Sequence, residues 1–146
     1  MATSADLRTT PIGYWLKQAD LMLTEHLGRV LDDHGLTRFH WQVLNLLNQR
    51  GTTTRAAVSE AMQLFVDAAG VDGILDDLAR RGWLWRREHG GEGTTELALT
   101  DEGRQGHRRV FELVDATRKR SQEGISEEDY ATVISTLQRM VANLER

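Results

Sequence analysis

The 146-residue sequence contains no cysteine, one proline and two lysines. Without cysteine, the protein cannot form disulfides or thiolate metal sites, and this composition fits a reducing cytoplasm. No apolar stretch approaches the roughly 18–20 residues that span a bilayer, so no membrane partner is expected. The N-terminus also lacks a basic segment followed by an apolar run, so we expect no signal peptide. The length predicts a single domain over residues 1–146, and we expect the protein to be cytoplasmic.

The charge is mildly negative, and it is unevenly distributed. The formal net charge is −4, and residues 51–100 carry five basic and eight acidic side chains. The rest of the sequence is nearly balanced. A free-standing nucleic-acid binder is usually basic, so the middle of the chain is unusually acidic for that class of protein.

Motifs for catalysis or metal binding are missing. The serines lie in no nucleophile motif, and no phosphate-binding loop is present. Five histidines raise a metal hypothesis, since His26, His34 and His40 follow one another along the first two predicted helices. No pair has the His-x3-His spacing, so the alternative is histidines at the surface or the edge of the core. We expect no enzyme, no metal site and no cofactor.

Hydrophobic periodicity and cap residues predict about six helices. The only proline, Pro11, precedes all the regular structure that we predict, and Gly35 ends the first helix. Thr37, Asp67, Thr100 and Ser126 are expected N-caps, and either Thr53 or Thr54 caps a short helix between them. The predicted helices cover about residues 12–34, 38–50, 55–62, 68–81 and 101–122, and a last one follows Ser126.

Two short strands follow the fourth helix. Gly82 ends that helix, 83–88 and 95–99 have strand patterns, and a glycine-rich tip joins them. A strand pair directly after a helix-turn-helix predicts a winged helix. The fold class is therefore mainly α with a small β-wing, made of about six helices and a two-stranded hairpin.

The terminal helices carry apolar stripes that a small winged lobe cannot cover. We therefore expect a homodimer in which residues 11–34 and 101–146 form dimerisation helices. Residues 37–100 would form the DNA-binding lobe, and the dimer would hold two such lobes at a fixed spacing.

Three segments resemble the MarR family of bacterial transcription regulators: LDDLARRGWLWR at 75–86, LALTDEGR at 97–104, and VDAAGVDGILDD at 66–77. The resemblance covers nearly the whole chain. It implies a homodimer of winged helices that binds a roughly palindromic operator in double-stranded DNA. Many members lose affinity for the operator when a small, often phenolic, compound binds between the dimerisation and DNA-binding parts.

The chain departs from the family where DNA would be contacted. Asp72 and Gly73 replace a threonine-arginine pair of the recognition helix, and 91–93 (Gly-Glu-Gly) replaces the Asp-x-Arg signature of the wing. Asp72 could accept from cytosine N4, or it could belong to a solvated helix face. Gly70 and Gly73 each disfavour the helix by about 1 kcal/mol. They reflect either neutral drift or close approach of the backbone to the groove.

Several residues could still contact DNA. Arg86 either binds phosphate or pairs with Asp76 or Asp77 within the domain, and the hydroxyls of 52–54 can meet phosphates. The predicted DNA-binding set is Arg38, Thr53, Thr54, Arg55, Ala68, Ala69, Asp72, Gly73, Arg86, Arg87, His89, Thr94 and Thr95.

Aromatic residues of the first two helices could bind a phenolic compound or an aromatic acid, as the resemblance implies. The predicted ligand-binding set is Tyr14, Trp15, Phe39, His40 and Trp41. The alternative is that Trp15 and Trp41 belong to the core.

The leading hypothesis is a homodimeric DNA-binding repressor of the MarR type, relieved by a small aromatic ligand. The first alternative is a winged-helix dimer that has lost specific DNA binding and acts through proteins. The second is a small-molecule-binding dimer with little role on DNA. The acidic recognition helix and the arginine-free wing tip motivate the first alternative.

Overall fold

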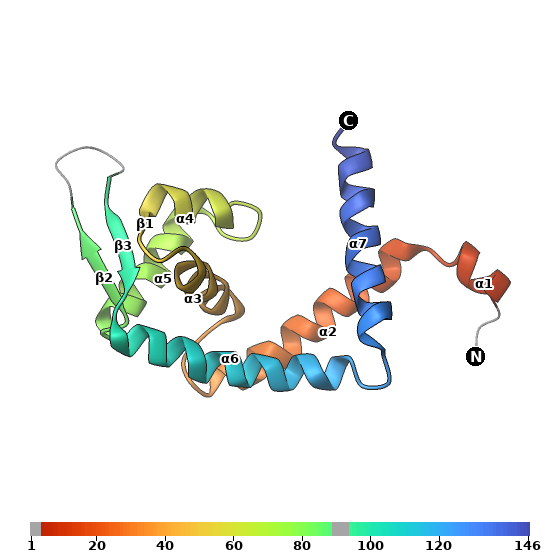
Figure 1. The fold of residues 1–146 in the computed structure, drawn as a ribbon, viewed down its shortest axis with the longest axis horizontal. Helices are drawn as coiled ribbons and strands as arrows, with labels where there is room; N and C mark the ends of the chain where they lie inside the picture. Colours follow the sequence, from red (N-terminus) through yellow and green to blue (C-terminus); the bar gives the residue numbers. More distant parts are fainter. Residues whose placement is uncertain (1–3, 89–93) are drawn as a thin grey trace.

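A small winged lobe lies at one end of the molecule, and long helices lead away from it (Figure 1). The computed structural model describes residues 4–88 and 94–146. Over these ranges the elements are α1 (Ser4–Thr9), α2 (Ile12–Asp32), α3 (Arg38–Arg50), β1 (Thr53–Thr54), α4 (Arg55–Met62), α5 (Ala68–Arg80), β2 (Leu84–Arg87), β3 (Glu96–Leu99), α6 (Asp101–Ser121) and α7 (Glu127–Leu144). The mainly helical winged fold is as predicted.

The expectation that Pro11 precedes all regular structure is wrong, because α1 lies before it. The hydroxyls of Thr9 and Thr10 donate to the Asp6 carbonyl oxygen at 3.1 and 2.8 Å and close the end of this helix. Six residues are too few for a hydrophobic period to be visible in the sequence.

The wing contains three strands rather than the two predicted. β1 and β2 both pair with β3 in antiparallel fashion, giving the order β1-β3-β2. Thr53 lies opposite Leu97, and Leu84 lies opposite Leu99. A two-residue strand shows no alternation, so β1 leaves no pattern in the sequence. Its pairing ties the start of α4 to the wing.

The predicted helix starts are confirmed by the cap geometry. Thr54, and not Thr53, caps α4, and a capping box at Thr37 also uses the His40 side chain. Each cap oxygen accepts a hydrogen bond from the backbone N–H three residues later: Thr37 from His40, Thr54 from Ala57, Asp67 from Gly70, Thr100 from Gly103 and Ser126 from Asp129. Such caps fix where each helix begins.

The hydrophobic core lies inside the lobe. Its fully buried side chains come from α3, α4, α5 and β3 and include Leu44, Leu47, Val58, Leu75, Leu78 and Leu97. The long helices reach this core near the lobe, through Leu31 of α2 and through Val110 and Val114 of α6. The lobe therefore has a core of its own, to which α2 and α6 are anchored.

Trp83 joins the wing to α6. A Cβ added to Gly103 would lie 2.1 Å from the Trp83 carbonyl oxygen, and one added to Gly106 would lie 2.8 Å from its ring. The Thr100 hydroxyl also donates to the Gly82 carbonyl oxygen at 2.6 Å. The glycines of α6 thus permit a close contact that fixes the wing relative to the long helix.

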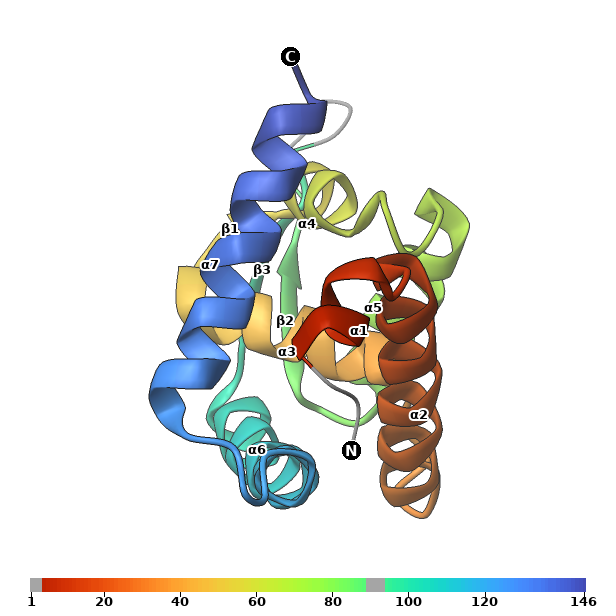
Figure 2. The ribbon, with the colours of Figure 1, turned by 90° about the vertical axis from the view of Figure 1, so that its right-hand side faces the viewer.

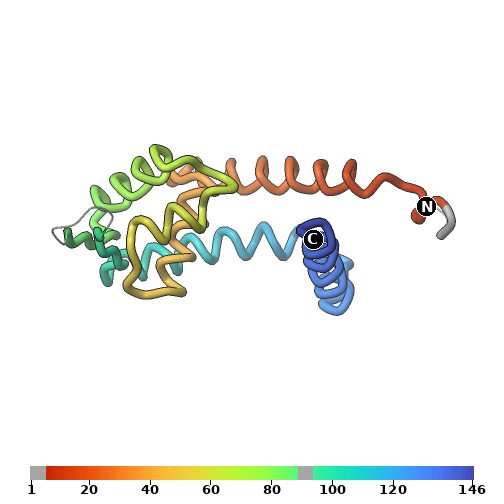
Figure 3. Tube along the Cα trace, turned by 90° about the horizontal axis from the view of Figure 1, so that it is seen from above, coloured from red at the N-terminus to blue at the C-terminus, as the bar shows by residue number. Residues whose placement is uncertain are grey.

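The long helices present apolar side chains to solvent. α2 and α6 contact each other, and α7 turns away from α6 after Gly124 (Figures 1 and 3). Viewed along the long axis, α7 and α2 stand apart (Figure 2). α7 buries none of its residues in this chain, and its exposed apolar side chains are Tyr130, Val133, Ile134, Val141 and Leu144. None of the described helices is long and apolar enough to cross a bilayer.

Candidate nucleic-acid interface

The outward side of α5 is the surface that the sequence places against DNA. Val71, Ile74, Leu75 and Leu78 point into the core, so the opposite side remains accessible. We call this side the α5 outer face and define it by Ala68, Ala69, Asp72, Gly73 and Asp76. These residues are small or acidic, so the face carries no cation of its own.

Arg55 supplies a cation to this face from another helix. Its Nε and Nη2 donate to the two carboxylate oxygens of Asp72, each at 2.5 Å. Arg55 is the first residue of α4, and its backbone N–H donates to the Thr95 carbonyl oxygen at 3.0 Å. Arg55 is thus fixed to the wing by its backbone and to α5 by its side chain. This hydrogen bonding holds the pKa of the Asp72 carboxyl below its usual range.

Arg86 supplies a second cation from β2. Its Nη1 donates to the Asp76 carboxylate at 2.6 Å, which confirms the predicted pairing within the domain. The charge of Arg86 also helps to lower the pKa of Asp72, so the two ion pairs belong to one cluster. Both acidic residues of the outer face are therefore neutralised by arginines of neighbouring elements.

Asp77 lies on the inward side of the helix and has a different role. Its carboxylate accepts from Arg81 Nε at 3.0 Å and contacts His40 Nε2 at 3.1 Å. Burial opposes ionisation of Asp77, but Arg81 and His40 together hold its pKa below the usual range. Arg81 also donates to the carbonyl oxygens of His34 and Gly35. This group is a structural tie between α5 and the start of α3.

The two helical glycines of α5 differ. A Cβ at Gly70 would lie 2.3 Å from Val66 Cγ1, so packing within the lobe accounts for this glycine. A Cβ at Gly73 would meet no atom within 4 Å. Gly73 therefore leaves the middle of the outer face open, and nothing within the chain requires a glycine there.

Other predicted DNA-binding residues lie on β1, on β2 and just before β3. Thr53 and Thr54 are in β1, Thr95 accepts from Arg55, and Thr94 precedes β3. Arg87 lies next to Arg86 in β2 and is exposed. His89 and the 91–93 tip fall outside the described residues.

Arg38 is not brought to the outer face. Its Nη1 donates to the Asp20 carboxylate at 3.0 Å and to the Thr24 hydroxyl at 2.6 Å, both on α2. The sequence places Arg38 at the start of the second helix, among the residues that could contact DNA. Its observed partners make it a link between α3 and α2.

The five predicted ligand-binding residues do not form one site. Tyr14 and Trp15 pack edge to face at the exposed start of α2, with ring centroids 5.1 Å apart, and Trp15 is 58% exposed. Trp41 packs against the core and stacks on His107, as its alternative interpretation predicted. His40 is engaged by Asp77 and Thr37, and Phe39 lines a separate hollow. The single chain therefore does not bring these five residues together, and ligand binding by them stays a prediction.

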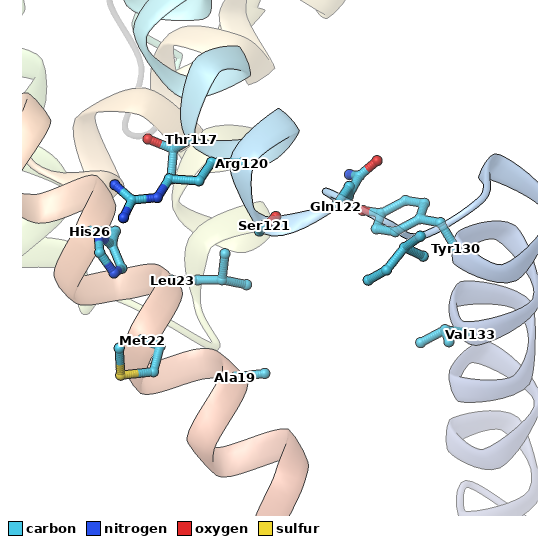
Figure 4. A pocket seen from close by; sticks show the side chains of 11 residues that line it. Ala19, Met22, Leu23, His26, Thr117, Arg120, Ser121, Gln122, Tyr130 and Val133 are labelled. Atoms are coloured by element: carbon cyan, nitrogen blue, oxygen red, sulfur yellow. The ribbon is translucent and has the colours of Figure 1, made fainter. Parts of the chain in front are cut away.

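A different cavity, of about 460 Å³, lies between α2, α6 and α7 (Figure 4). Ala19, Met22 and Leu23 of α2 face Tyr130 and Val133 of α7 across it. The polar residues at its edge are His26, Thr117, Arg120, Ser121 and Gln122. An apolar cavity with the cation of Arg120 at its edge suits a ligand that has an aromatic or other apolar body and one anionic group. Hydrophobic periodicity in the sequence predicted that these apolar residues form stripes on α2 and α7. It could not show that the two helices lie on opposite sides of one cavity.

Within the described part of the chain, no cluster of three or more histidine or acidic side chains could hold a metal ion. Of the three histidines that suggested a metal site, His40 binds Asp77 and His26 lines the cavity. The alternative interpretation of surface and core-edge histidines describes their positions.

No family profile and no curated protein sequence matches the chain. Similar solved structures include a MarR-family transcriptional regulator from Rhodococcus sp. RHA1, at 26% identity and a TM-score of 0.78. That match covers 96% of this chain and 95% of the other. CouR from Rhodococcus jostii RHA1 bound to p-coumaroyl-CoA is 25% identical, with a TM-score of 0.76 and coverage of 90% and 92%.

A third similar structure is a mutant MarR from E. coli complexed with operator DNA. It is 18% identical, has a TM-score of 0.74, and the match covers 91% of this chain and 95% of the other. At this identity the likeness concerns the fold. These neighbours are transcriptional regulators and not enzymes, in agreement with the prediction that no enzyme is present. Together with the motifs at 75–86 and 97–104, the matches show that the chain has the winged helix-turn-helix fold and is similar to MarR-family transcriptional regulators.

Proposed function

We propose that this protein is a homodimeric DNA-binding transcriptional repressor whose α5 outer face enters the major groove of each operator half-site. One observation carries the proposal: the acidic residues of that face are already paired with Arg55 and Arg86. The face therefore does not present bare carboxylates to phosphates. A neighbour of the same fold is complexed with operator DNA, which supports DNA binding by this fold.

The wing and the start of α4 would contact the DNA backbone. Arg87 and the hydroxyls of Thr53 and Thr54 lie on elements that flank α5. Backbone contacts of this kind set the orientation of a recognition helix but carry no sequence information. The paired arginines can each still donate to DNA, because an arginine has five N–H groups.

The exposed apolar side chains of the long helices support a homodimer. Val133, Ile134 and Val141 of α7 face solvent in the single chain, as do Ile12 and Leu16 of α2. Exposed apolar side chains on two long helices are typical of a subunit interface. In the dimer that we propose, a two-fold axis would relate the two α5 helices, as a palindromic operator requires.

The cavity between α2, α6 and α7 is the proposed site for a small aromatic acid that relieves repression. Its apolar walls would take the ring, and Arg120 at its edge would bind the carboxylate. The p-coumaroyl-CoA complex of CouR supports a ligand with an aromatic group in this fold. A panel of aromatic acids should raise the melting temperature of the wild type, and Arg120→Ala should reduce that shift. Gln138→Ala, on the same helical arm but outside the cavity, is the control.

Selection from random duplex DNA tests DNA recognition. The full-length protein is mixed with a random pool, bound duplexes are sequenced, and the affinity for the enriched site is followed against salt. A recovered palindrome with a salt-dependent affinity is expected. If no sequence is enriched and binding is weak at about 50 mM salt, the proposed function is wrong.

A second candidate is a winged-helix dimer that acts through proteins or small molecules and has lost specific DNA binding. The acidic balance of residues 51–100, with five basic and eight acidic side chains, favours it. The selection experiment also decides this point, because such a dimer would enrich no duplex while retaining its dimer interface and its cavity.

A further inference from the structure

We propose that Asp72 is a positioning residue, which orients Arg55 so that Arg55 recognises a guanine in each operator half-site. This inference rests on the proposed function and specifies how the α5 outer face distinguishes sequences. It assigns the acidic residue of the recognition helix a favourable role in DNA binding. The cation that the helix lacks at Gly73 would thus come from α4.

The geometry of the ion pair supports this assignment. Asp72 engages Nε and Nη2 of Arg55 through both of its oxygens, so the guanidinium is held on one edge. The opposite edge, formed by Nη1 and the second hydrogen of Nη2, is left for an outside acceptor. Two parallel donors match O6 and N7 of guanine in the major groove. An arginine fixed in this way loses less conformational entropy on binding.

The surroundings leave room for a base edge. Ala68 and Ala69 are small, and the space beside Gly73 is open to at least 4 Å. The pair is also accessible, since the Arg55 and Asp72 side chains are 39% and 44% exposed. The Arg55 backbone is tied to Thr95, so the side chain reaches α5 from a fixed origin. These features place a preorganised donor pair where DNA would lie.

Substitution of Asp72 distinguishes positioning from simple charge repulsion. If Asp72 merely repels phosphate, Asp72→Ala strengthens binding to every sequence and leaves base preference unchanged. If Asp72 positions Arg55, Asp72→Ala lowers the preference for guanine at one base pair of each half-site by about tenfold. Glu60→Ala is the matched control, because it removes an exposed carboxylate from α4 without touching the pair.

Arg55→Lys separates base recognition from a phosphate contact. Lysine keeps the charge but lacks the planar pair of parallel donors that Asp72 would orient, so the same guanine preference should fall. If Arg55→Lys retains the preference, or if Arg55→Ala weakens all sequences equally, Arg55 contacts phosphate and the inference is wrong. Thermal melting of each variant confirms that the fold is kept.

The measurement is the affinity for the selected operator and for variants with each base pair changed. A wild type that enriches no duplex contradicts the proposed function, and the inference with it. A wild type that enriches a palindrome, with Asp72 and Arg55 variants that keep its base preferences, contradicts the inference alone.

Discussion

The helices α5 and α7 are both amphipathic and both begin at a side-chain cap, but only α5 buries its apolar side within this chain. Val71, Leu75 and Leu78 of α5 lie in the lobe core, whereas no residue of α7 is buried. The lobe is therefore complete without a partner, and the helical arm is not. Under the proposed function, what α5 presents to DNA would be fixed within one chain, while the spacing of two such helices would depend on a second copy.

The largest effect is expected from Leu78→Ala in the lobe. Leu78 is fully buried, so its truncation leaves a cavity and should lower the free energy of unfolding by about 2–5 kcal/mol. Urea denaturation at fixed protein concentration measures the loss. Leu144→Ala at the end of α7 is the matched change, because this leucine is 85% exposed. An equal loss in both variants would contradict the difference between the two regions.

A smaller effect is expected where the lobe meets α6. Gly103→Ala places a Cβ 2.1 Å from the Trp83 carbonyl oxygen, so the wing or α6 must shift. We expect the free energy of unfolding to fall by about 1–3 kcal/mol. Gly13→Ala in α2 is the control, since its Cβ would meet no atom. Thermal or urea denaturation measures the change. If Gly103→Ala does not lower the free energy of unfolding, Gly103 and Trp83 are not in close contact in solution.

On the helical arm, Val141→Glu should weaken the proposed dimer without unfolding the lobe, because Val141 is exposed and lies outside the cavity. A carboxylate in an apolar interface lacks a partner, so we expect the dimer dissociation constant to rise at least about tenfold. Sedimentation equilibrium gives this constant, and far-ultraviolet circular dichroism shows whether the lobe remains folded. Gln138→Glu adds the same charge to an exposed polar position of α7. A Val141→Glu protein that associates like the wild type would place the interface elsewhere.

The smallest effect concerns pH. His40 Nδ1 accepts a hydrogen bond from the Thr37 backbone N–H, and burial lowers the His40 pKa below its ordinary value of 6.5. As the pH falls, His40 therefore takes up a proton in the unfolded chain before it does so in the folded protein. The contribution of His40 to the free energy of unfolding is complete above pH 6.5 and decreases as the pH falls below that value.

His40→Gln should reduce the slope of the free energy of unfolding against pH, by at most about 1.4 kcal/mol per pH unit. Urea denaturation between pH 7.5 and 5.5 measures the slope. Burial also lowers the pKa of His107, so part of the slope remains in this variant. His34→Gln, at an exposed histidine, controls for the loss of an imidazole. An unaltered slope in the His40 variant would show that its protonation is not linked to folding.

Local signals in the sequence predicted the lobe well. Cap residues and glycines act within a few residues, so Thr37, Asp67 and Thr100 could be assigned without knowledge of the fold. The pairing of Arg86 was also foreseen, as an alternative, because β2 follows α5 after a short turn. The two-residue β1 could not be predicted, since its existence depends on β3, more than forty residues later.

The interactions of the site were harder to predict. The Arg55–Asp72 pair joins residues 17 positions apart on two helices, and its formation depends on how α4 crosses α5. The positions of the aromatic residues were hard to predict for the same reason. Sequence spacing placed Tyr14 and Trp41 on neighbouring helices, but it did not show that Trp41 packs on His107, in the lobe, while Tyr14 lies at the far end of α2.

The central claim, that the α5 outer face enters the major groove, can be tested directly because the chain has no cysteine. Gly73→Cys introduces a unique thiol at an open position of that face, to which a DNA-cleaving iron chelate can be attached. Gln138→Cys on α7 is the control. The account predicts cleavage at two symmetric positions of the selected operator, about one helical turn apart. No cleavage above that of the Gln138→Cys conjugate would contradict it.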